Sequence, residues 1–257
     1  MIEGHPDLFK PLPTERAPVK PWRPRPLENH EWADRDYIGL YKWRVDMLAK
    51  LRADPDMLTD AKAYYAKHPK EFICHWLDTY NPRLKRSKWV PFVLFRRQAD
   101  FIDFLEELRR DNESGLVEKC RDVGASWLGC AYSVWTFSFI KDDATGWGSR
   151  KEDLVDKRGD PDSLFEKMRL LINRMPDVFR PPAGHAFMKL VNKENGATVT
   201  GEAGDNLGRG GRKSRYFVDE SAHIERAELI EASLGDNTEV RIDMSSVNGT
   251  GNMFHRR

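Results

Sequence analysis

Residues 119–126, which read Lys-Cys-Arg-Asp-Val-Gly-Ala-Ser, match a phosphate-binding loop whose lysine is out of place. The common loop reads G-x-x-x-x-G-K-[ST]: backbone N–H groups cradle phosphates, the lysine neutralises them, and the hydroxyl group binds Mg²⁺. On that frame Gly124 and Ser126 occupy the last-glycine and metal-ligand positions. Ala125, however, stands at the lysine position, and Lys119 stands at the first-glycine position. Either the loop has lost its function, or its cation comes from the other end.

Two adjacent carboxylates end an apolar stretch further along the chain. Tyr216, Phe217 and Val218 precede Asp219 and Glu220, and α/β sheets place their chemistry at the carboxyl ends of strands. In a nucleotide hydrolase the first acid holds Mg²⁺ and the second can orient the attacking water as a base. Neighbouring residues of an extended strand point to opposite faces, so the strand must end at this pair. Alone, such a pair is more often a solvated strand end, but the candidate loop upstream favours the functional interpretation.

A glycine-rich basic segment stands just before these acids. Residues 208–212 read Gly-Arg-Gly-Gly-Arg, and the two guanidinium groups can bind phosphate oxygens in a forked geometry. A solvated basic turn is the alternative interpretation. Where nucleotides are hydrolysed between subunits, such a loop can supply an arginine finger. Arg209 is the first candidate for that role and Arg212 the second.

Two further polar features are weaker signals. Residues 245–251 read Ser-Ser-Val-Asn-Gly-Thr-Gly and follow an apolar stretch. They form either a simple turn or a polar row that senses the γ-phosphate. Gln98 opens a predicted helix, and its amide offers one donor and one acceptor to an adenine edge. A surface glutamine is the alternative.

The elements around these residues alternate between strands and helices. Residues 116–117 and 126–140 predict a short strand and an apolar helix on either side of the loop. Ser163 and Glu166 predict a capping box for a helix towards Met175. Such alternation favours a doubly wound, largely parallel sheet. The other predicted elements are strands 187–191 and 197–201 across the Asn195-Gly196 turn, strands 215–219 and 240–247, and a helix near 225–234.

The first third of the chain differs in composition. Seven of the 15 prolines lie between Pro6 and Pro26, which favours an extended arm over residues 1–30. Apolar spacing predicts a helical subdomain over 31–85, ending in a basic patch at 83–88. The core would occupy 86–257 and begin with an extended segment at 90–95 and a helix that carries Phe101.

Composition limits the remaining possibilities. The 42 basic residues balance 41 acidic ones, so any contact with DNA must be local. The three cysteines favour a reducing compartment, and no secretory signal or spanning segment is visible. We therefore expect a soluble, intracellular protein. No metal-binding spacing is present among the histidines, which we interpret as structural or surface residues: His5, His185, His223 and His255.

Together these motifs resemble the ATPase domain of the large terminase subunit, the DNA-packaging motor of tailed bacteriophages. The resemblance runs from about Thr79 to the end of the sequence. It implies a P-loop NTPase fold of the RecA-like (ASCE) type, with a mostly parallel central sheet flanked by helices. The matching segments, in order, are 118–127, 148–153, 195–196, 201–204, 208–212, 218–220 and 245–249.

The resemblance also implies roles for individual residues. The family's lysine is commonly displaced to the amino-terminal end of the loop, which implies that Lys119 binds phosphate. Ser126 and Asp219 would bind Mg²⁺, and Glu220 would activate water. Segment 245–249 matches the motif that couples hydrolysis to movement, although Ser246 and Val247 depart from the family's usual Ser-Thr-Pro-Asn-Gly. The implied nucleotide contacts are Gln98 at the adenine, Lys119 with its companion cation Arg121, Asp122, Val123, Gly124, Ala125, Ser126, Trp127, Ser245 and Asn248.

The implied activity is ATP hydrolysis with Mg²⁺ that drives double-stranded DNA into a procapsid in the host-cell cytoplasm. The implied partners are DNA bound without sequence reading, the portal protein, the small terminase subunit and a ring of further copies on the procapsid, with no membrane. A monomer is the alternative for an isolated fragment. The family's second, RNase H-type nuclease domain has no room here, so we expect no nuclease activity. Two alternatives stay open. One is another P-loop DNA translocase, such as a helicase-like motor, and the other is a non-catalytic packaging or docking module, for which Ala125 argues.

Overall fold

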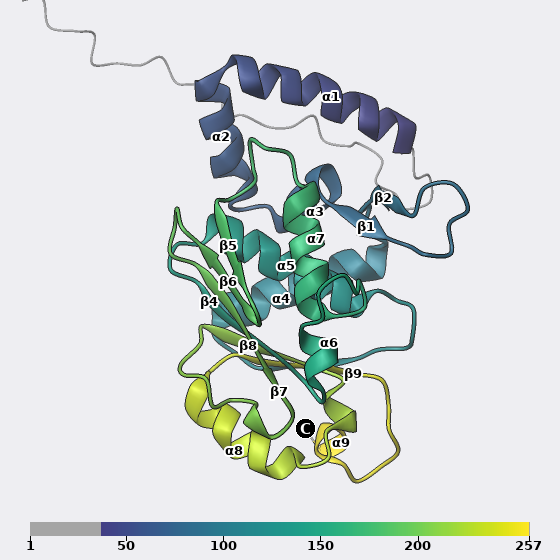
Figure 1. Cartoon of the computed structure of the whole chain (residues 1–257), viewed down its shortest axis with the longest axis vertical. Helices are drawn as coiled ribbons and strands as arrows, with labels where there is room; N and C mark the ends of the chain where they lie inside the picture. The colour runs from purple at the N-terminus through teal and green to yellow at the C-terminus, as the bar shows by residue number, and fades with distance from the viewer. Residues whose placement is uncertain (1–36, 257) are drawn as a thin grey trace, which may run out of the picture.

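The computed structural model of the chain describes residues 37–256. The predicted proline-rich arm at 1–30 lies outside these described residues. Within them, a seven-stranded sheet forms the centre of the molecule, with helices on both faces and three helices at one end (Figure 1).

The sheet is mostly parallel, which confirms the predicted fold class. Its first five strands run parallel, and the last two form an antiparallel edge. Parallel strands need crossover connections, and the helices provide them. In order across the sheet the strands are β3 (Gly115–Glu118), β9 (Arg241–Ser245), β8 (Arg215–Asp219), β4 (Ala144–Ser149), β7 (Thr198–Ala203), β6 (Lys189–Asn192) and β5 (Ala183–Ala186).

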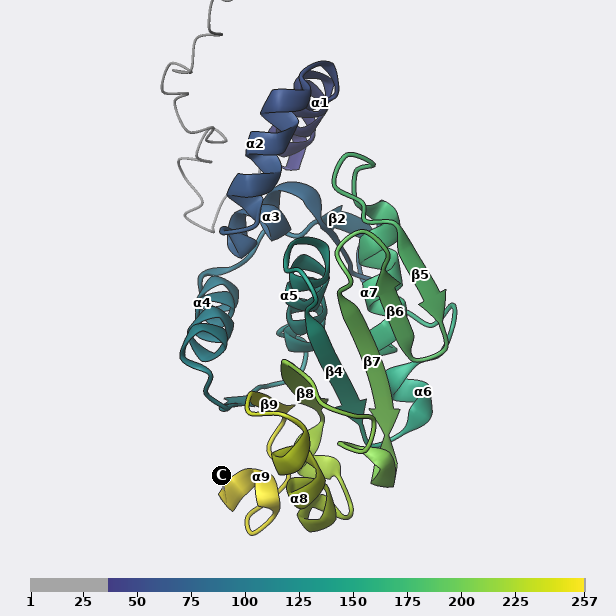
Figure 2. The ribbon, with the colours of Figure 1, turned by 90° about the vertical axis from the view of Figure 1, so that its left-hand side faces the viewer.

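The alternation of side chains along β8 assigns the two faces of the sheet. Phe217 packs into the large core with helix α5 (Ala125–Phe139), whereas Tyr216 and Val218 pack with Ile230 and Leu234 of α8 (Ala227–Asn237). Because successive strand residues point to opposite faces, α5 and α8 must cover opposite faces. Figure 2 shows α5 and α8 on either side of β8. The helices α4 (Arg96–Asp111) and α7 (Leu164–Arg174) pack beside α5.

Strand β4 is central, yet the sequence analysis did not predict it. Its sequence, Ala-Thr-Gly-Trp-Gly-Ser, lacks the β-branched run that usually marks a buried strand. The two glycines are required by close packing: a Cβ atom on Gly146 would lie 2.3 Å from the Tyr216 ring, and one on Gly148 would lie 2.2 Å from Leu207. Trp147 fills the other face and stacks on Phe217 with ring centroids 4.5 Å apart.

The amino-terminal helices are α1 (Tyr37–Ala53), α2 (Pro55–Tyr65) and α3 (Pro69–Trp76). The Asp54 carboxylate accepts from the backbone N–H groups of the first turn of α2, which caps that helix. These helices share the hydrophobic core of the sheet region, because Leu51, Tyr65 and Phe72 belong to the same buried cluster as Trp135 of α5. The Trp135 ring N–H also donates to the Tyr65 carbonyl at 2.7 Å. A short antiparallel pair, β1 (Asp78–Tyr80) and β2 (Trp89–Pro91), follows them. The division into a helical subdomain and a core stays a prediction.

Two local predictions have different outcomes. The Asn195-Gly196 turn joins the antiparallel strands β6 and β7 as predicted, with Gly196 at φ 77°. The predicted capping box at Ser163 is wrong: its hydroxyl accepts from the N–H of Lys157 instead, and Glu166 pairs with Arg169. The remaining short elements are α6 (Glu152–Val155), η1 (Gly204–Asn206), η2 (Ser221–His223) and α9 (Met253–Arg256).

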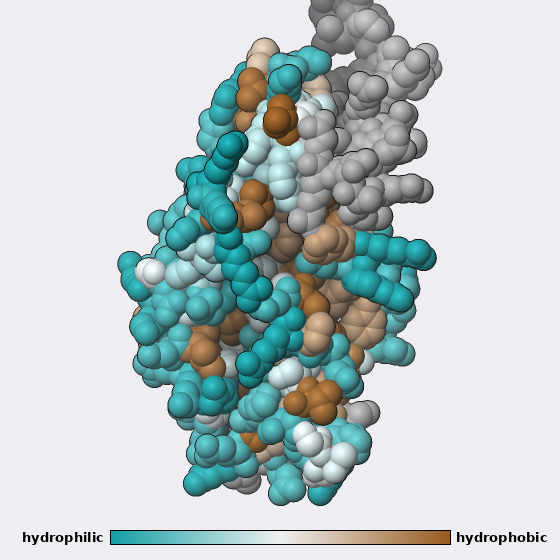
Figure 3. Space-filling view, turned by 90° about the vertical axis from the view of Figure 1, so that its right-hand side faces the viewer, coloured by the Kyte–Doolittle hydropathy of each residue, from teal (hydrophilic) through white to brown (hydrophobic). Residues whose placement is uncertain are grey.

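The surface of the described residues carries both apolar and hydrophilic side chains. None of the helices between residues 37 and 256 is both long enough and apolar enough to cross a bilayer. On the face in Figure 3, apolar side chains form separate patches among hydrophilic ones. Single exposed apolar side chains of this kind are normal for folded proteins.

The packing of α5 on β4 can be tested with two helix glycines. A Cβ atom on Gly129 would lie 2.8 Å from the Trp147 ring, which is fully buried and bonded to Ser133 at 2.9 Å. We expect Gly129→Ala to lower the free energy of unfolding by about 1 kcal/mol, because overpacking outweighs the gain in helix propensity. Gly235→Ala in α8 meets no atom within 4 Å and should leave stability unchanged or raise it. Urea unfolding measures both, and equal stabilisation would contradict this packing.

Candidate functional site

The candidate phosphate loop connects β3 to α5, in the predicted order of strand, loop and helix. Asp122 and Gly124 adopt left-handed conformations, at φ 68° and 77°, and Gly124 is the residue from which α5 begins. Such a turn at a helix amino terminus presents backbone N–H groups and the positive end of the helix dipole to an anion. The loop therefore has a backbone suited to phosphate.

Lys119 joins this loop to the acidic pair at the end of β8. Its ammonium lies 2.8 Å from Glu220 Oε1 and 3.5 Å from Asp219 Oδ1, and its side chain is 13% exposed. Burial opposes the charge of Lys119, but the carboxylates of Asp219 and Glu220 outweigh it and raise the pKa of the ammonium above its usual value. Lys119 is therefore a stable cation at this site.

The end of β8 explains how two adjacent acids act together. Strand β8 stops at Asp219, and Glu220 turns the chain with φ 56°, a left-handed conformation that is uncommon outside glycine. Without that turn the two carboxylates would point to opposite faces of the sheet. The strand therefore ends at this pair, as the sequence analysis required, and the turn places both carboxylates beside Lys119.

Ser126 and Asp219 are suited to hold a Mg²⁺ ion. The Ser126 hydroxyl donates to Asp219 Oδ2 at 2.9 Å, while Asp219 Oδ1 is buried and has the Lys119 ammonium 3.5 Å away. Burial raises the pKa of Asp219, and Lys119 opposes that shift. Hydroxyl and carboxylate oxygens fit Mg²⁺, which usually takes few protein ligands and completes its shell with water and phosphate. No cluster of three or more His, Cys, Asp or Glu suited to a metal occurs within residues 37–256.

Gln98 braces the loop from the first turn of α4. Its amide nitrogen donates to the Val123 carbonyl at 3.0 Å, and its amide oxygen accepts from the Phe95 N–H at 3.0 Å. Both ends of the amide therefore have protein partners. Recognition of adenine by Gln98 stays a prediction.

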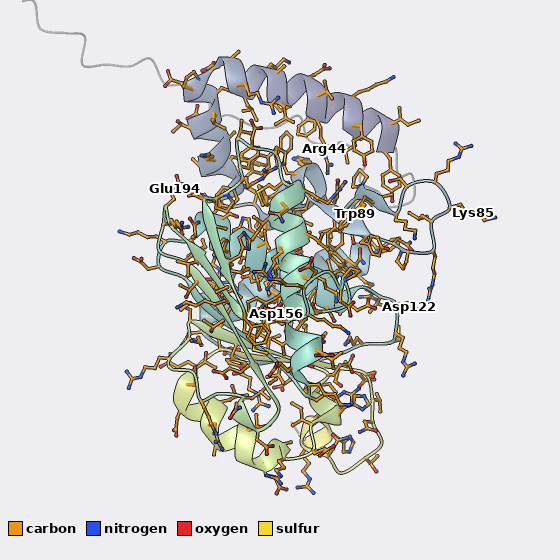
Figure 4. The ribbon with its side chains drawn as sticks, in the orientation of Figure 1. Arg44, Lys85, Trp89, Asp122, Asp156 and Glu194 are labelled. Atoms are coloured by element: carbon orange, nitrogen blue, oxygen red, sulfur yellow. The ribbon has the colours of Figure 1, made fainter. Side chains whose placement is uncertain are left out.

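The other predicted loop residues have varied surroundings. Arg121 and Val123 are exposed, and Ala125 is buried in the first turn of α5. Trp127 is half-buried, with its ring 6.2 Å from that of Trp89. Asp122 pairs with Arg83 of the β1–β2 connection at 2.9 Å, and Figure 4 shows Asp122 on the same side of the molecule as Lys85 of that connection. Their roles as nucleotide contacts stay predictions.

Three contacts tie the polar row after β9 to the turn that follows the acids. Ser245 accepts from the Ala222 N–H at 3.1 Å, Asn248 donates to the Ala222 carbonyl at 2.9 Å, and Ser246 bonds to His223 at 3.2 Å. His223 also lies 3.6 Å from Glu220 Oε2. It is therefore part of the site, which the sequence analysis missed. The available signal was its spacing of three residues from Glu220, which brings the two side chains together on a helical turn.

Lys167 is a second residue that the sequence analysis missed. It lies in α7 with 6% exposure, its ammonium is 5.9 Å from the Trp127 ring, and it donates to the Asp162 carbonyl. Burial lowers its pKa, while the nearby Cys130 and Asp219 oppose that shift. Its signal in the sequence is a lysine on the apolar face of a helix, among Leu164, Phe165, Met168, Leu171 and Ile172.

The two candidate finger residues do not join this cluster. Arg209 and Arg212 are exposed, and neither guanidinium bonds to another of the described residues. Both lie in the connection that runs from the carboxyl end of β7 to the amino end of β8. Arg212 lines a cavity of about 590 Å³ with Lys213 and Asn237, at the end of the sheet opposite Lys119.

The charge of the buried Lys167 is expected to lower the free energy of unfolding by an amount that depends on pH. Because its pKa is lowered in the folded chain, the unfolded chain binds this proton more tightly, and protonation opposes folding as the pH falls below 10.5. We expect Lys167→Met to be more stable than the wild type at pH 7 by about 1 kcal/mol. The difference should shrink as the pH rises towards 10.5. Denaturant unfolding across this range measures it, with the exposed Lys67→Met as control. A difference that does not change with pH would contradict the assignment.

Comparisons with known proteins concern the fold. No protein-family model matches the sequence, and no curated protein matches it. Among solved structures, the large terminase of bacteriophage HK97 aligns with 70% of this chain and 37% of its own, at 15% identity and a TM-score of 0.51. The ATPase domain of the Thermus phage P74-26 large terminase aligns over 55% and 62% (18% identity, TM-score 0.43). The large terminase of another thermophilic bacteriophage, solved in complex with ADP, aligns over 59% and 38% (12% identity, TM-score 0.42).

The similarity to the HK97 large terminase supports the predicted fold class. The match covers about a third of the HK97 protein, and at 15% identity it concerns architecture alone. The mostly parallel sheet with its flanking helices is the part that this chain shares. The resemblance to phage large terminases that the sequence motifs indicate is therefore also present in the fold of the chain.

Proposed function

We propose that the chain is the ATPase motor of a terminase large subunit, which hydrolyses ATP with Mg²⁺ to move double-stranded DNA into a procapsid. The observation that carries the proposal is the contact of Lys119 with Asp219 and Glu220, next to Ser126. A cation, a paired hydroxyl and carboxylate, and a second acid at a helix amino terminus are the parts that phosphoryl transfer needs.

The geometry suggests a role for each group. Phosphates would bind the N–H groups of the loop, and Lys119 would neutralise them. Ser126 and Asp219 would hold Mg²⁺, which supplies positive charge to the phosphate oxygens. As phosphate draws Lys119 away, Glu220 loses its 2.8 Å partner and becomes free to accept a proton from the attacking water. One lysine would then both bind the substrate and release the base.

The polar row that begins at the end of β9, residues 245–248, would transmit the result of hydrolysis. Glu220 contacts His223, and His223 and Ala222 bond to Ser246, Ser245 and Asn248. A change in the position of Glu220 would therefore displace His223 and the segment after β9. We propose that this segment couples hydrolysis to movement.

The partners follow from the same proposal. DNA would be held through its phosphates without sequence reading, so binding should weaken steeply with salt. Several copies would form a ring with the portal protein and the small terminase subunit. Arg209 or Arg212 would act on the site of a neighbouring copy, because both are exposed and neither guanidinium bonds to another described residue of its own chain. In the host cytoplasm such a motor would need no membrane contact.

The role of Glu220 can be tested by a change that keeps its shape. We expect Glu220→Gln to lower ATP turnover about 100-fold or more, because the amide cannot accept the proton. Nucleotide affinity should be retained, since the loop N–H groups, Lys119 and Ser126 that would bind the phosphates and Mg²⁺ are unchanged. Turnover is measured with and without DNA, and Glu225→Gln, an exposed neighbour, serves as control.

The possible outcomes separate the alternatives. Unchanged turnover in Glu220→Gln would refute the assigned base. No turnover in the wild type under either condition would favour a non-catalytic docking module. Strand separation by the wild type would favour a helicase-like motor.

The displaced cation can be tested by affinity. We expect Lys119→Met to weaken nucleotide binding about 10-fold to 100-fold, the usual value of a charge-assisted hydrogen bond. Arg121→Met should have a smaller effect, because Arg121 is exposed whereas the Lys119 side chain is largely buried. Titration with a fluorescent nucleotide measures both dissociation constants. If neither variant binds more weakly, the displaced lysine is not a phosphate ligand.

A further inference from the structure

The segment that carries the two free arginines, residues 204–214, is held in place at its backbone. We call it the arginine loop. The Gly208 N–H donates to Glu202 Oε2 at 2.5 Å, and the Gly208 carbonyl accepts from Asn237 at 3.0 Å. Lys213 N–H donates to the Asn237 carbonyl at 3.0 Å. The loop is therefore fixed between the end of β7 and the end of α8.

The backbone of the arginine loop packs directly against helix α8 at Gly208. Its φ is 78°, and a Cβ atom there would lie 2.8 Å from the backbone nitrogen of Leu234 in α8. Only glycine combines that conformation with that distance. The position of the loop against α8 is thus set by the backbone itself.

Glu202 lies under the loop with an unusual set of partners. Its Oε2 accepts from Gly208 and from the Tyr216 hydroxyl at 2.7 Å, whereas Oε1 is buried and has no hydrogen-bond partner. A Cβ atom on Gly210 would lie 2.0 Å from Oε1. The two oxygens therefore face Gly208 and Gly210, the residues on either side of Arg209.

Glu202 bonds to the backbone of the loop and not to its cations. The residue is half-buried, with its Oε1 atom out of contact with solvent, and three cations follow it within the same loop: Arg209, Arg212 and Lys213. The structure gives Glu202 no ion pair among the described residues, and both arginines are exposed. The carboxylate therefore holds the loop backbone while the guanidinium groups stay available.

We propose that Glu202 is the positioning residue of the arginine loop and that Arg209 is the finger it presents to a neighbouring copy. This inference rests on the proposed ATPase function. Glu202 bonds to the Gly208 N–H and lies against Gly210, and we call these two contacts on either side of Arg209 the clamp. Arg212 lies outside the clamp, beside the cavity at the opposite end of the sheet. The clamp fixes the backbone so that the Arg209 side chain enters the partner's site with little loss of conformational entropy.

Gly210→Ala tests the clamp without removing an arginine. The new methyl group can be accommodated only if the Glu202 carboxylate turns away from Gly208 and Tyr216, or if the loop moves. Either change releases Arg209. We expect turnover to fall about 10-fold or more while nucleotide affinity stays the same, because the chain's own phosphate site is untouched. Gly235→Ala, which meets no atom within 4 Å, is the matched control and should keep full turnover.

Glu202→Ala and Glu202→Gln separate positioning from charge. The alanine variant loses the bond to Gly208 and should behave like Gly210→Ala. The glutamine variant keeps an oxygen for Gly208 and should retain most of the turnover. Arg209→Ala should match the alanine variant, and Arg212→Ala should have the smaller effect.

Mixing experiments test the action between copies. Equal amounts of Gly210→Ala and Glu220→Gln should together turn over more ATP than either alone, because one copy supplies the loop and the other the base. A merely structural defect would not be rescued in this way. No rescue, or full turnover in both Gly210→Ala and Glu202→Ala, would overturn the proposal while leaving the ATPase assignment to the Glu220→Gln result.

Trypsin gives a readout that needs no activity. A clamped loop should be cut slowly after Arg209 in the wild type and in Gly235→Ala, and at least several-fold faster in Gly210→Ala and Glu202→Ala. Circular dichroism shows whether each variant is folded. Equal cleavage rates in folded variants would overturn the proposal even if the chain hydrolyses no ATP.

Discussion

The contact between Lys119 and the acids Asp219 and Glu220 is the constraint on which the site depends. The strand order places β9 between β3 and β8, so Lys119 must reach across one strand to bond Glu220 at 2.8 Å. Two strand spacings amount to about 10 Å, and only a long side chain spans them. A lysine at the first-glycine position after β3 can therefore reach the acids, as Lys119 does.

Strand β9, which lies between β3 and β8, connects the lysine to the turn that follows the acids. Ser245 at the end of β9 accepts the Ala222 N–H, and its own carbonyl accepts the Lys119 N–H at 2.9 Å. The cation, the polar row and the acids consequently form one line across three parallel strands that all end at the same edge of the sheet. His223 closes that line by contacting both Glu220 and Ser246. Direct bonds therefore connect all the members of this line.

The sequence predicted the parts of this site that local chemistry determines. The loop before α5, the strand 215–219 and the turn at Asn195-Gly196 follow from short patterns of glycine, apolar and acidic residues. Contacts between distant segments were not predictable in the same way. Strand β4 was missed because its glycines are explained only by Tyr216 and Leu207 from other segments. His223 and Lys167 were missed because their importance comes from neighbours in space.

The positions of Arg209 and Arg212 were also not predictable from local sequence. The glycine-rich basic segment suggested an arginine finger, but only the fold shows that the loop runs from the carboxyl end of β7 to the amino end of β8. Arg215 and Asp219 are the two ends of that strand, which places them about 13 Å apart. Strand β8 is fully buried at the centre of the sheet and cannot shorten that distance. The two arginines therefore differ in place: Arg209 follows Gly208, which is bonded to Glu202 near the carboxyl end of β7, whereas Arg212 lines the cavity at the amino end of β8.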